Sequence, residues 1–161
     1  MNKVELIKTE AESLLKKMVD SSEIEVTEDE GVAHVVIKTE ADAPTIIGRH
    51  GETIRALQKI LEVIVYKASG ESTQILVNVN DYREKQKERL QGIASELAQR
   101  ARDEKRPTHF RGLSSYERKL IHEYITQEFS DLTTYSVGEG RERHLVIDLK
   151  SNHVDHDAAE D

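Results

Sequence analysis

Cysteine and tryptophan are absent from this chain of 161 residues, and proline occurs only twice. Without cysteine, disulfides, thiolate metal sites and cysteine nucleophiles are excluded. Aromatic residues make up 4% of the chain, so extensive stacking on nucleotide bases is not expected. No apolar run approaches the roughly 18 residues of a membrane span, and residues 1–5 lead into no apolar signal-peptide core. We therefore expect a cytoplasmic protein that does not contact a membrane.

Charge is plentiful but unevenly distributed. The net charge of -8 argues at first sight against a polyanionic ligand. However, residues 1–43 hold 5 basic and 11 acidic residues, whereas residues 44–150 hold 18 and 16. Within residues 99–119, seven Lys or Arg stand against three Asp or Glu. A locally basic stretch in an acidic chain fits a focused anion-binding face. Charge alone fits an ordinary solvated helix face better.

Hydrophobic spacing predicts a first domain over residues 1–80. A helix over 2–19 precedes a hairpin whose strands lie near 24–26 and 32–37. A short helix, capped by Asp42 with Pro44 in its first turn, ends near Ile47. A stronger amphipathic helix follows Gly51 and ends at residues 69–70, and a strand follows at 75–79.

A second domain is expected over residues 81–150. It opens with a long helix that runs to about Lys105, because Pro107 forbids continuation. A strand at 108–111 comes next, and then a helix to about Glu128 that begins with a capping box formed by Ser114 and Glu117. A closing hairpin pairs 133–137 with 143–149. The acidic segment 151–161 lacks periodicity and is predicted to be a disordered tail.

The most informative motif is Gly48-Arg49-His50-Gly51. Two glycines let a backbone turn tightly and approach a polyanion, and the loop feeds a helix whose first free amides point at a phosphate. The residues between the glycines, Arg49 and His50, are then the ones that touch the sugar-phosphate backbone. The pattern by itself also fits a plain helix–turn–helix joint. The apolar pair Ile46-Ile47 before it and the amphipathic helix after it favour the functional interpretation.

Together with its flanking elements, this motif closely resembles a type II KH domain. The resemblance implies an α-β-β-α-α-β order, with a three-stranded sheet covered by helices on one face. It also implies a base-binding groove beside the loop, with an apolar floor from Ile46 and Ile47, to which Ile54 and Val77 are weaker additions.

A second resemblance rests on Arg118 and His122, which stand one helical turn apart on one face. Such a pair is common on ordinary helices. The preceding cap, the basic stretch with Arg111 and Lys119, and the closing hairpin make it resemble the R-3-H domain, a small α+β module that binds single-stranded nucleic acids. Arg118 offers a planar fork of donors to phosphate, and His122 can donate to the same anion or stack on a base.

A type II KH domain joined by a long helix to an R-3-H domain resembles the Jag (SpoIIIJ-associated, KhpB-like) family of bacterial RNA-binding proteins. The resemblance covers about residues 1–150. It implies single-stranded RNA as ligand, with single-stranded DNA as the alternative, a role in post-transcriptional regulation, and a small single-KH-domain protein as a partner. Many members carry an N-terminal Jag-N domain, which we expect to be missing here.

Two other classes of function compete with this interpretation. An enzyme is disfavoured, because there is no Walker-type P-loop and no triad or paired-carboxylate spacing. No cofactor is implied, and His153 and His156 in the acidic tail indicate only loose, nonspecific metal binding. A protein–protein adaptor built on the same scaffold remains the alternative, although Arg49 and His50 count against a loop that has lost RNA binding.

Overall fold

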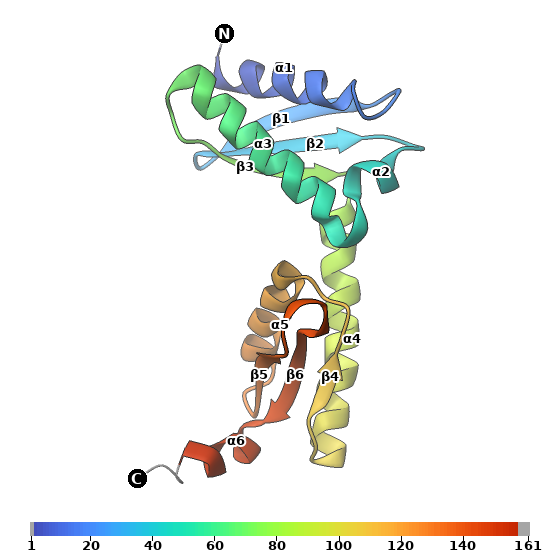
Figure 1. The fold of residues 1–161 in the computed structure, drawn as a ribbon, viewed down its shortest axis with the longest axis vertical. Coiled ribbons are helices and arrows are strands. Elements are labelled where there is room, and N and C mark those ends of the chain that lie inside the picture. Colours follow the sequence, from blue (N-terminus) through green and yellow to red (C-terminus); the bar gives the residue numbers. More distant parts are fainter. Residues whose placement is uncertain (1, 158–161) are drawn as a thin grey trace. The chain divides into compact units, whose positions relative to one another are not determined.

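Two three-stranded sheets organise the chain, one in each of two units that divide between Arg83 and Glu84 (Figure 1). The computed structural model describes residues 2–157. Both units combine helices with a sheet, so the predicted α+β class is confirmed.

The first unit has the element order of a type II KH domain, as predicted. Its elements are α1 (Lys3–Leu15), β1 (Glu23–Asp29), β2 (Val32–Lys38), α2 (Ala43–Ile47), α3 (Glu52–Ser69) and β3 (Gln74–Val79). A single 3-10 turn, η1 (Arg49–Gly51), joins α2 to α3. The first helix ends at Leu15 rather than near Val19, because the chain there leaves the helix through tighter turn bonds such as Met18 N–H to the Leu15 carbonyl.

The sheet of this unit presents one face to the helices. Strand β2 lies in the centre, antiparallel to β1 and parallel to β3. Because side chains alternate along a strand, every second residue of β2 and β3 is buried. These residues form one core with the apolar stripes of α1 and α3, in which Ile7, Val35, Leu61 and Val77 are almost fully buried. Asp42 occupies the position before α2, but its side chain makes no cap hydrogen bond.

The second unit packs helices on an antiparallel sheet of order β4-β6-β5. Its elements are β4 (Thr108–Phe110), α5 (Ser115–Glu128), β5 (Leu132–Val137), β6 (His144–Leu149) and most of the long helix α4 (Tyr82–Glu104). Ser114 and Glu117 form the predicted capping box, with Ser114 Oγ accepting from the Glu117 amide at 3.2 Å. The core joins Leu90 and Ala94 of α4 to Ile121 and Ile125 of α5 and to Ile147 of β6.

The segment after β6 differs from the predicted disordered tail. Residues 150–157 form a further helix, α6 (Lys150–Asp157). Two contacts anchor its start: the Lys150 amide donates to the Asp131 carbonyl at 3.0 Å, and Asn152 Nδ2 donates to Asp148 Oδ1 at 2.8 Å. Both partners lie outside the segment, Asp131 before β5 and Asp148 in β6, so periodicity within the segment could not reveal them. Residues 158–161 of the predicted tail lie outside the described residues.

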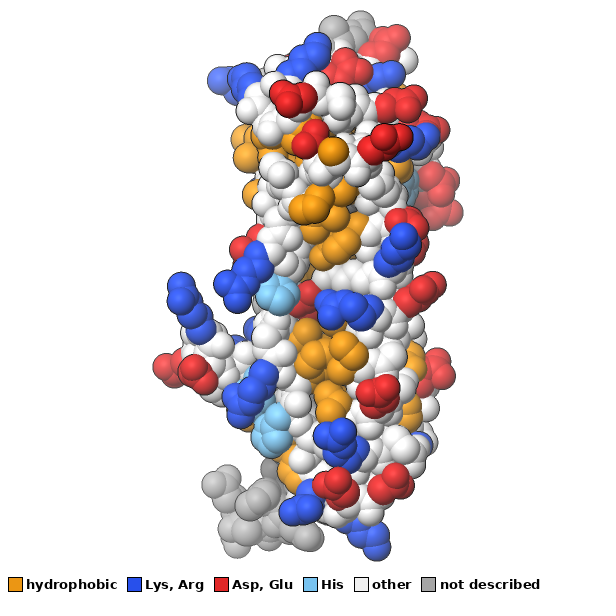
Figure 2. Space-filling view, turned by 90° about the vertical axis from the view of Figure 1, so that its right-hand side faces the viewer, with side chains coloured by type: hydrophobic (Ala, Val, Ile, Leu, Met, Phe, Trp, Pro, Cys, Tyr) orange, Lys and Arg blue, Asp and Glu red, His pale blue; other side chains and the backbone are white. Residues whose placement is uncertain are grey.

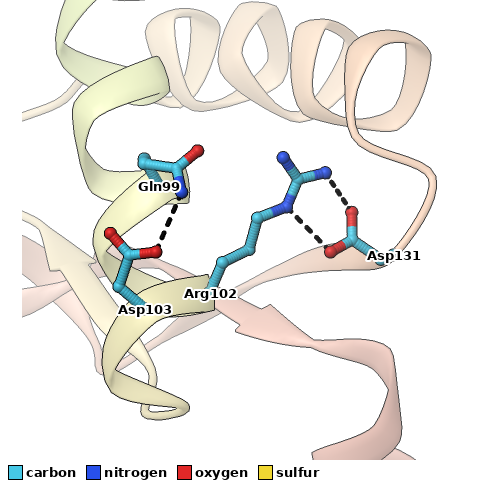
Figure 3. Close-up of polar contacts among 4 residues, drawn as sticks. All are labelled: Gln99, Arg102, Asp103 and Asp131. Carbon is cyan, nitrogen blue, oxygen red and sulfur yellow. Dashed lines mark hydrogen bonds and ion pairs between the residues drawn. The ribbon is translucent and has the colours of Figure 1, made fainter.

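An ion pair ties the end of α4 to the turn before β5 (Figure 3). Arg102 Nε donates to Asp131 Oδ2 at 2.8 Å, and a second guanidinium nitrogen of Arg102 bonds the other carboxylate oxygen. The guanidinium also lies 4.9 Å from the centre of the Phe129 ring. The hydrogen bond from Arg102 lowers the pKa of the Asp131 carboxyl below its ordinary value of 3.8.

This pair should make stability depend on pH in the acid range. Because the pKa of Asp131 is lowered by folding, its contribution is present above the unfolded value and is lost as pH falls through the folded value. Urea unfolding should show Asp131→Asn less stable than the wild type at about pH 6, with the difference shrinking below about pH 4. A difference that stays constant down to about pH 2 would contradict this assignment.

Candidate nucleic-acid interface

The loop between α2 and α3 depends on glycine at both ends. Gly48 adopts φ 70° and ψ -177°, a region almost restricted to glycine, and Gly51 adopts φ 72° and ψ 19°. A Cβ on Gly48 would lie 2.8 Å from the Cβ of Thr53 and 2.9 Å from its backbone nitrogen. At Gly48 the backbone therefore packs too closely against the start of α3 to leave room for a Cβ.

Arg49 and His50 stand at the tip of this turn. Arg49 is exposed and His50 is half-buried, in a left-handed conformation with φ 53°. Arg55 Nη1 donates to the His50 carbonyl at 3.2 Å, which helps to hold the unusual backbone. The first amide of α3, that of Glu52, donates to the Arg49 carbonyl. The next amides of this 18-residue helix receive no side-chain cap from Gly51, and they are the ones that an anion can bind.

The predicted apolar floor is mostly core. Ile46 and Val77 are fully buried and Ile54 is 2% exposed, whereas Ile47 is half-buried. The prediction that Ile46 lines an accessible groove is therefore wrong for this structure. Its side chain packs into the core formed with α1 and the sheet, where it supports the loop from beneath. Ile47 is the one residue of the predicted pair with surface beside the loop.

In the second unit, Arg118 and His122 line one hollow. This hollow has a volume of about 290 Å³ and lies where α5 meets β5 and the start of β6; its lining residues are Ser115, Arg118, Lys119, His122, Thr134, Tyr135, Ser136, Arg143 and Leu145. Arg118 Nη1 donates to the Leu113 carbonyl at 3.0 Å, and His122 Nδ1 shares a hydrogen bond with Thr134 Oγ1. Both side chains are thus held in place beside the hollow.

Arg111 lies elsewhere. It follows β4, and its Nη1 is 3.3 Å from Nδ1 of His144, while the next residue of β6, Leu145, lines the hollow. Because adjacent residues of a strand point to opposite faces, Arg111 contacts the opposite side of the sheet. The structure therefore gathers Arg118, Lys119 and His122 but does not bring Arg111 to them.

The sequence alone did not indicate the residues that the closing hairpin adds to this hollow. Thr134 and Ser136 come from β5, and Arg143 precedes β6. The sequence did contain a signal for the orientation of Arg143, since alternation along the strand places it on the same side as Leu145 and Ile147. What the sequence could not show is that this side faces the first turns of α5.

On the face of the molecule in Figure 2, lysine and arginine are interspersed with aspartate and glutamate, so this face carries no continuous basic surface. The glycine loop and the hollow are local groupings of basic side chains that could recognise an anion. Among residues 2–153, whose side chains the structure describes, no three His, Asp or Glu side chains gather as a metal site. No helix of the described part of the chain has the length and apolarity to cross a bilayer.

Two family models match the chain, one for each unit. The model of the KH domain of KhpA and KhpB covers residues 8–77, and the model of the R-3-H domain covers residues 88–149. The first range includes Gly48–Gly51 and the second includes Arg118 and His122. Fold and motifs thus define a protein that joins a type II KH domain to an R-3-H domain, and neither domain defines a family of enzymes.

Curated relatives extend the match across both domains. The chain is similar to "RNA-binding protein KhpB" of Bacillus subtilis, with 30% identity over 140 residues that cover 86% of this chain and 67% of the relative. It is 31% identical over 150 residues to the protein of that name from Streptococcus pneumoniae, covering 91% of this chain and 45% of the relative. The chain thus spans about half the length of that relative. It belongs to the KhpB (Jag) family.

Proposed function

We propose that this protein binds single-stranded RNA through two sites, the glycine loop of the KH domain and the hollow of the R-3-H domain. The observation that carries the proposal is the loop itself. An exposed arginine and a histidine project from a turn that only glycine permits, directly before the uncapped start of α3. The name "RNA-binding protein" of the relatives supports RNA as the ligand.

The chemistry of both sites suits the backbone more than the bases. Arg49 and Arg118 carry permanent charge and planar donors, while His50 and His122 can donate to phosphate. Aromatic residues are few, and the hollow has one aromatic lining residue, Tyr135. We therefore expect affinity to come mainly from phosphate contacts and to fall steeply with salt.

Two weak sites in one chain reinforce each other. Once the loop has bound one stretch of RNA, the hollow meets the remainder at a raised effective concentration. A strand long enough for both sites should therefore bind more tightly than one that fills only the loop. This arrangement fits a non-enzymatic, cytoplasmic regulator that acts on transcripts after their synthesis.

A protein partner belongs to the same proposal. The KH model that matches residues 8–77 is shared by KhpA and KhpB, which supports a small single-KH protein as the partner. Helix α3 also leaves Ile60, Val63 and Tyr66 exposed, an apolar stripe suited to a protein surface. Co-elution of the two purified proteins in size-exclusion chromatography would support this partner, and separate elution would count against it.

The proposal is tested by titrating a labelled RNA of about a dozen nucleotides, enough for several contacts of the four-nucleotide KH type. We expect binding of the single strand to exceed binding of the same RNA as a duplex, since the KH type of clamp grips unpaired backbone. With four phosphate contacts, raising salt from about 50 to 200 mM should weaken binding about 50-fold.

The same titration separates the alternatives. A single-stranded DNA of the same sequence shows whether the 2′-hydroxyl is read. No binding to either strand, or equal binding to the duplex, would contradict the proposal and favour the adaptor function.

A further inference from the structure

The hollow of the second unit is lined without a carboxylate. Its nine lining residues include three cations and a histidine but no Asp or Glu, in a chain that has 31 acidic residues. Other hollows differ in this respect. The one beside α3 and β3 includes Glu62, the one between α4 and α5 includes Glu123, and the one near the end of β2 includes Glu23 and Glu40. This hollow is therefore suited to an anion as the others are not.

Arg143 contributes one of these cations from outside the Arg118–His122 motif. It follows the turn η2 (Gly140–Glu142) and directly precedes β6. Its Nη1 donates to the Gly138 carbonyl at 3.0 Å, so the hairpin turn fixes one end of the guanidinium. The remaining N–H groups of the fork are able to donate to a ligand.

The neighbouring residue holds this part of the hairpin from the other side of the sheet. His144 is 8% exposed, and its Nδ1 lies 2.9 Å from the Glu142 carbonyl oxygen. Its Nε2 lies 2.9 Å from Nδ1 of His109, and Arg111 Nη1 approaches its Nδ1 at 3.3 Å. With His144 anchored in this way, Arg143 is positioned before any ligand arrives, which reduces the ordering cost of binding.

We infer that Arg143 completes the phosphate site of the R-3-H domain. Arg118 and Arg143, which reach the hollow from a helix and from a hairpin, bind the same backbone phosphate, with Lys119 and His122 beside them. Ser115 and Ser136 add neutral hydroxyl donors to the same hollow, whose 290 Å³ leaves room for the attached sugar. This inference rests on the proposed RNA binding and assigns to it a residue that the Arg–His motif does not contain.

The test compares Arg143→Ala with Arg141→Ala in the full chain. Arg141 lies two residues away in the same hairpin, is exposed and does not line the hollow, so it controls for net charge. Arg143→Ala should weaken single-stranded RNA binding about 5-fold to 10-fold and lower the slope of log affinity against log salt by about 0.7. Arg141→Ala should change affinity by less than about twofold, as expected for an exposed charge without a phosphate contact.

If Arg118 and Arg143 bind the same phosphate, the affinity losses of the two single variants should not add in the double variant. The double variant Arg118→Ala/Arg143→Ala should lose less affinity than the product of the two single losses, because either change already disrupts the common contact. Thermal melting shows that each variant remains folded.

Different results would overturn the role of Arg143 and the proposed function. Equal effects of Arg143→Ala and Arg141→Ala on an otherwise tight complex would overturn the inference alone. Fully multiplicative losses in the double variant would overturn the shared phosphate. A wild-type chain that binds no RNA would overturn the proposed function together with this inference.

Discussion

Replacing Arg49 and His50 together by aspartate should weaken binding of single-stranded RNA by about 100-fold at low salt. The change removes one permanent and one titratable cation from the tip of the loop and sets two carboxylates where phosphates are proposed to lie. Aspartate tolerates the left-handed conformation of His50 better than most residues, so the loop backbone should be retained. Fluorescence anisotropy with the labelled RNA measures the loss.

The matched control is Lys16→Asp/Lys17→Asp. These two adjacent lysines are exposed in the same unit, at the end of α1, so the substitution makes a similar change in net charge away from the loop. We expect the control to weaken binding by less than about threefold, because an exposed charge that makes no phosphate contact contributes little. Equal losses in both variants would show that net charge, rather than the loop, determines binding.

Gly48→Ala should damage both stability and binding. Its φ of 70° with ψ of -177° is nearly closed to residues with a Cβ, and the new methyl group would lie 2.8 Å from the Cβ of Thr53. Strain of this kind costs of the order of 1–3 kcal/mol, and relief requires the loop to move away from α3. Urea unfolding should therefore show a loss of about 2 kcal/mol, accompanied by weaker RNA binding.

Gly70→Ala is a control that introduces the backbone strain of a positive φ without a steric clash. Gly70 ends α3 with φ 75°, and a Cβ there would meet no atom within 4 Å. Gly70→Ala should therefore lower the free energy of unfolding only by the backbone term of about 1 kcal/mol, and it should leave RNA binding unchanged. If Gly48→Ala is no more harmful than Gly70→Ala, the close packing of the loop on Thr53 is not required.

Local signals were sufficient for most of the fold. The Ser114–Glu117 capping box, the stop before Pro107 and the glycine that ends α3 act within one turn of chain, so the sequence alone predicts them. The order of elements and the glycine loop follow from the same kind of short-range pattern.

The remaining features depend on contacts between distant segments. Ile46 has the sequence context of a groove residue, but the packing of α2 against the core buries it completely. Arg111 belongs by sequence to the basic stretch, yet the pairing of β4 with β6 turns it toward His144. Arg143 joins Arg118 only because β5 brings the hairpin beside α5. Each outcome is set by contacts between segments far apart in the chain, which hydrophobic spacing does not encode.

The most direct measurement is the change in backbone amide chemical shifts when single-stranded RNA is added to the full chain. We expect the largest changes at residues 48–54, around the glycine loop and the start of α3, and at residues 115–122 and 143 around the hollow. Changes confined to the exposed apolar stripe of α3, or the absence of any change at the loop, would contradict the claim that this protein binds RNA through its KH loop.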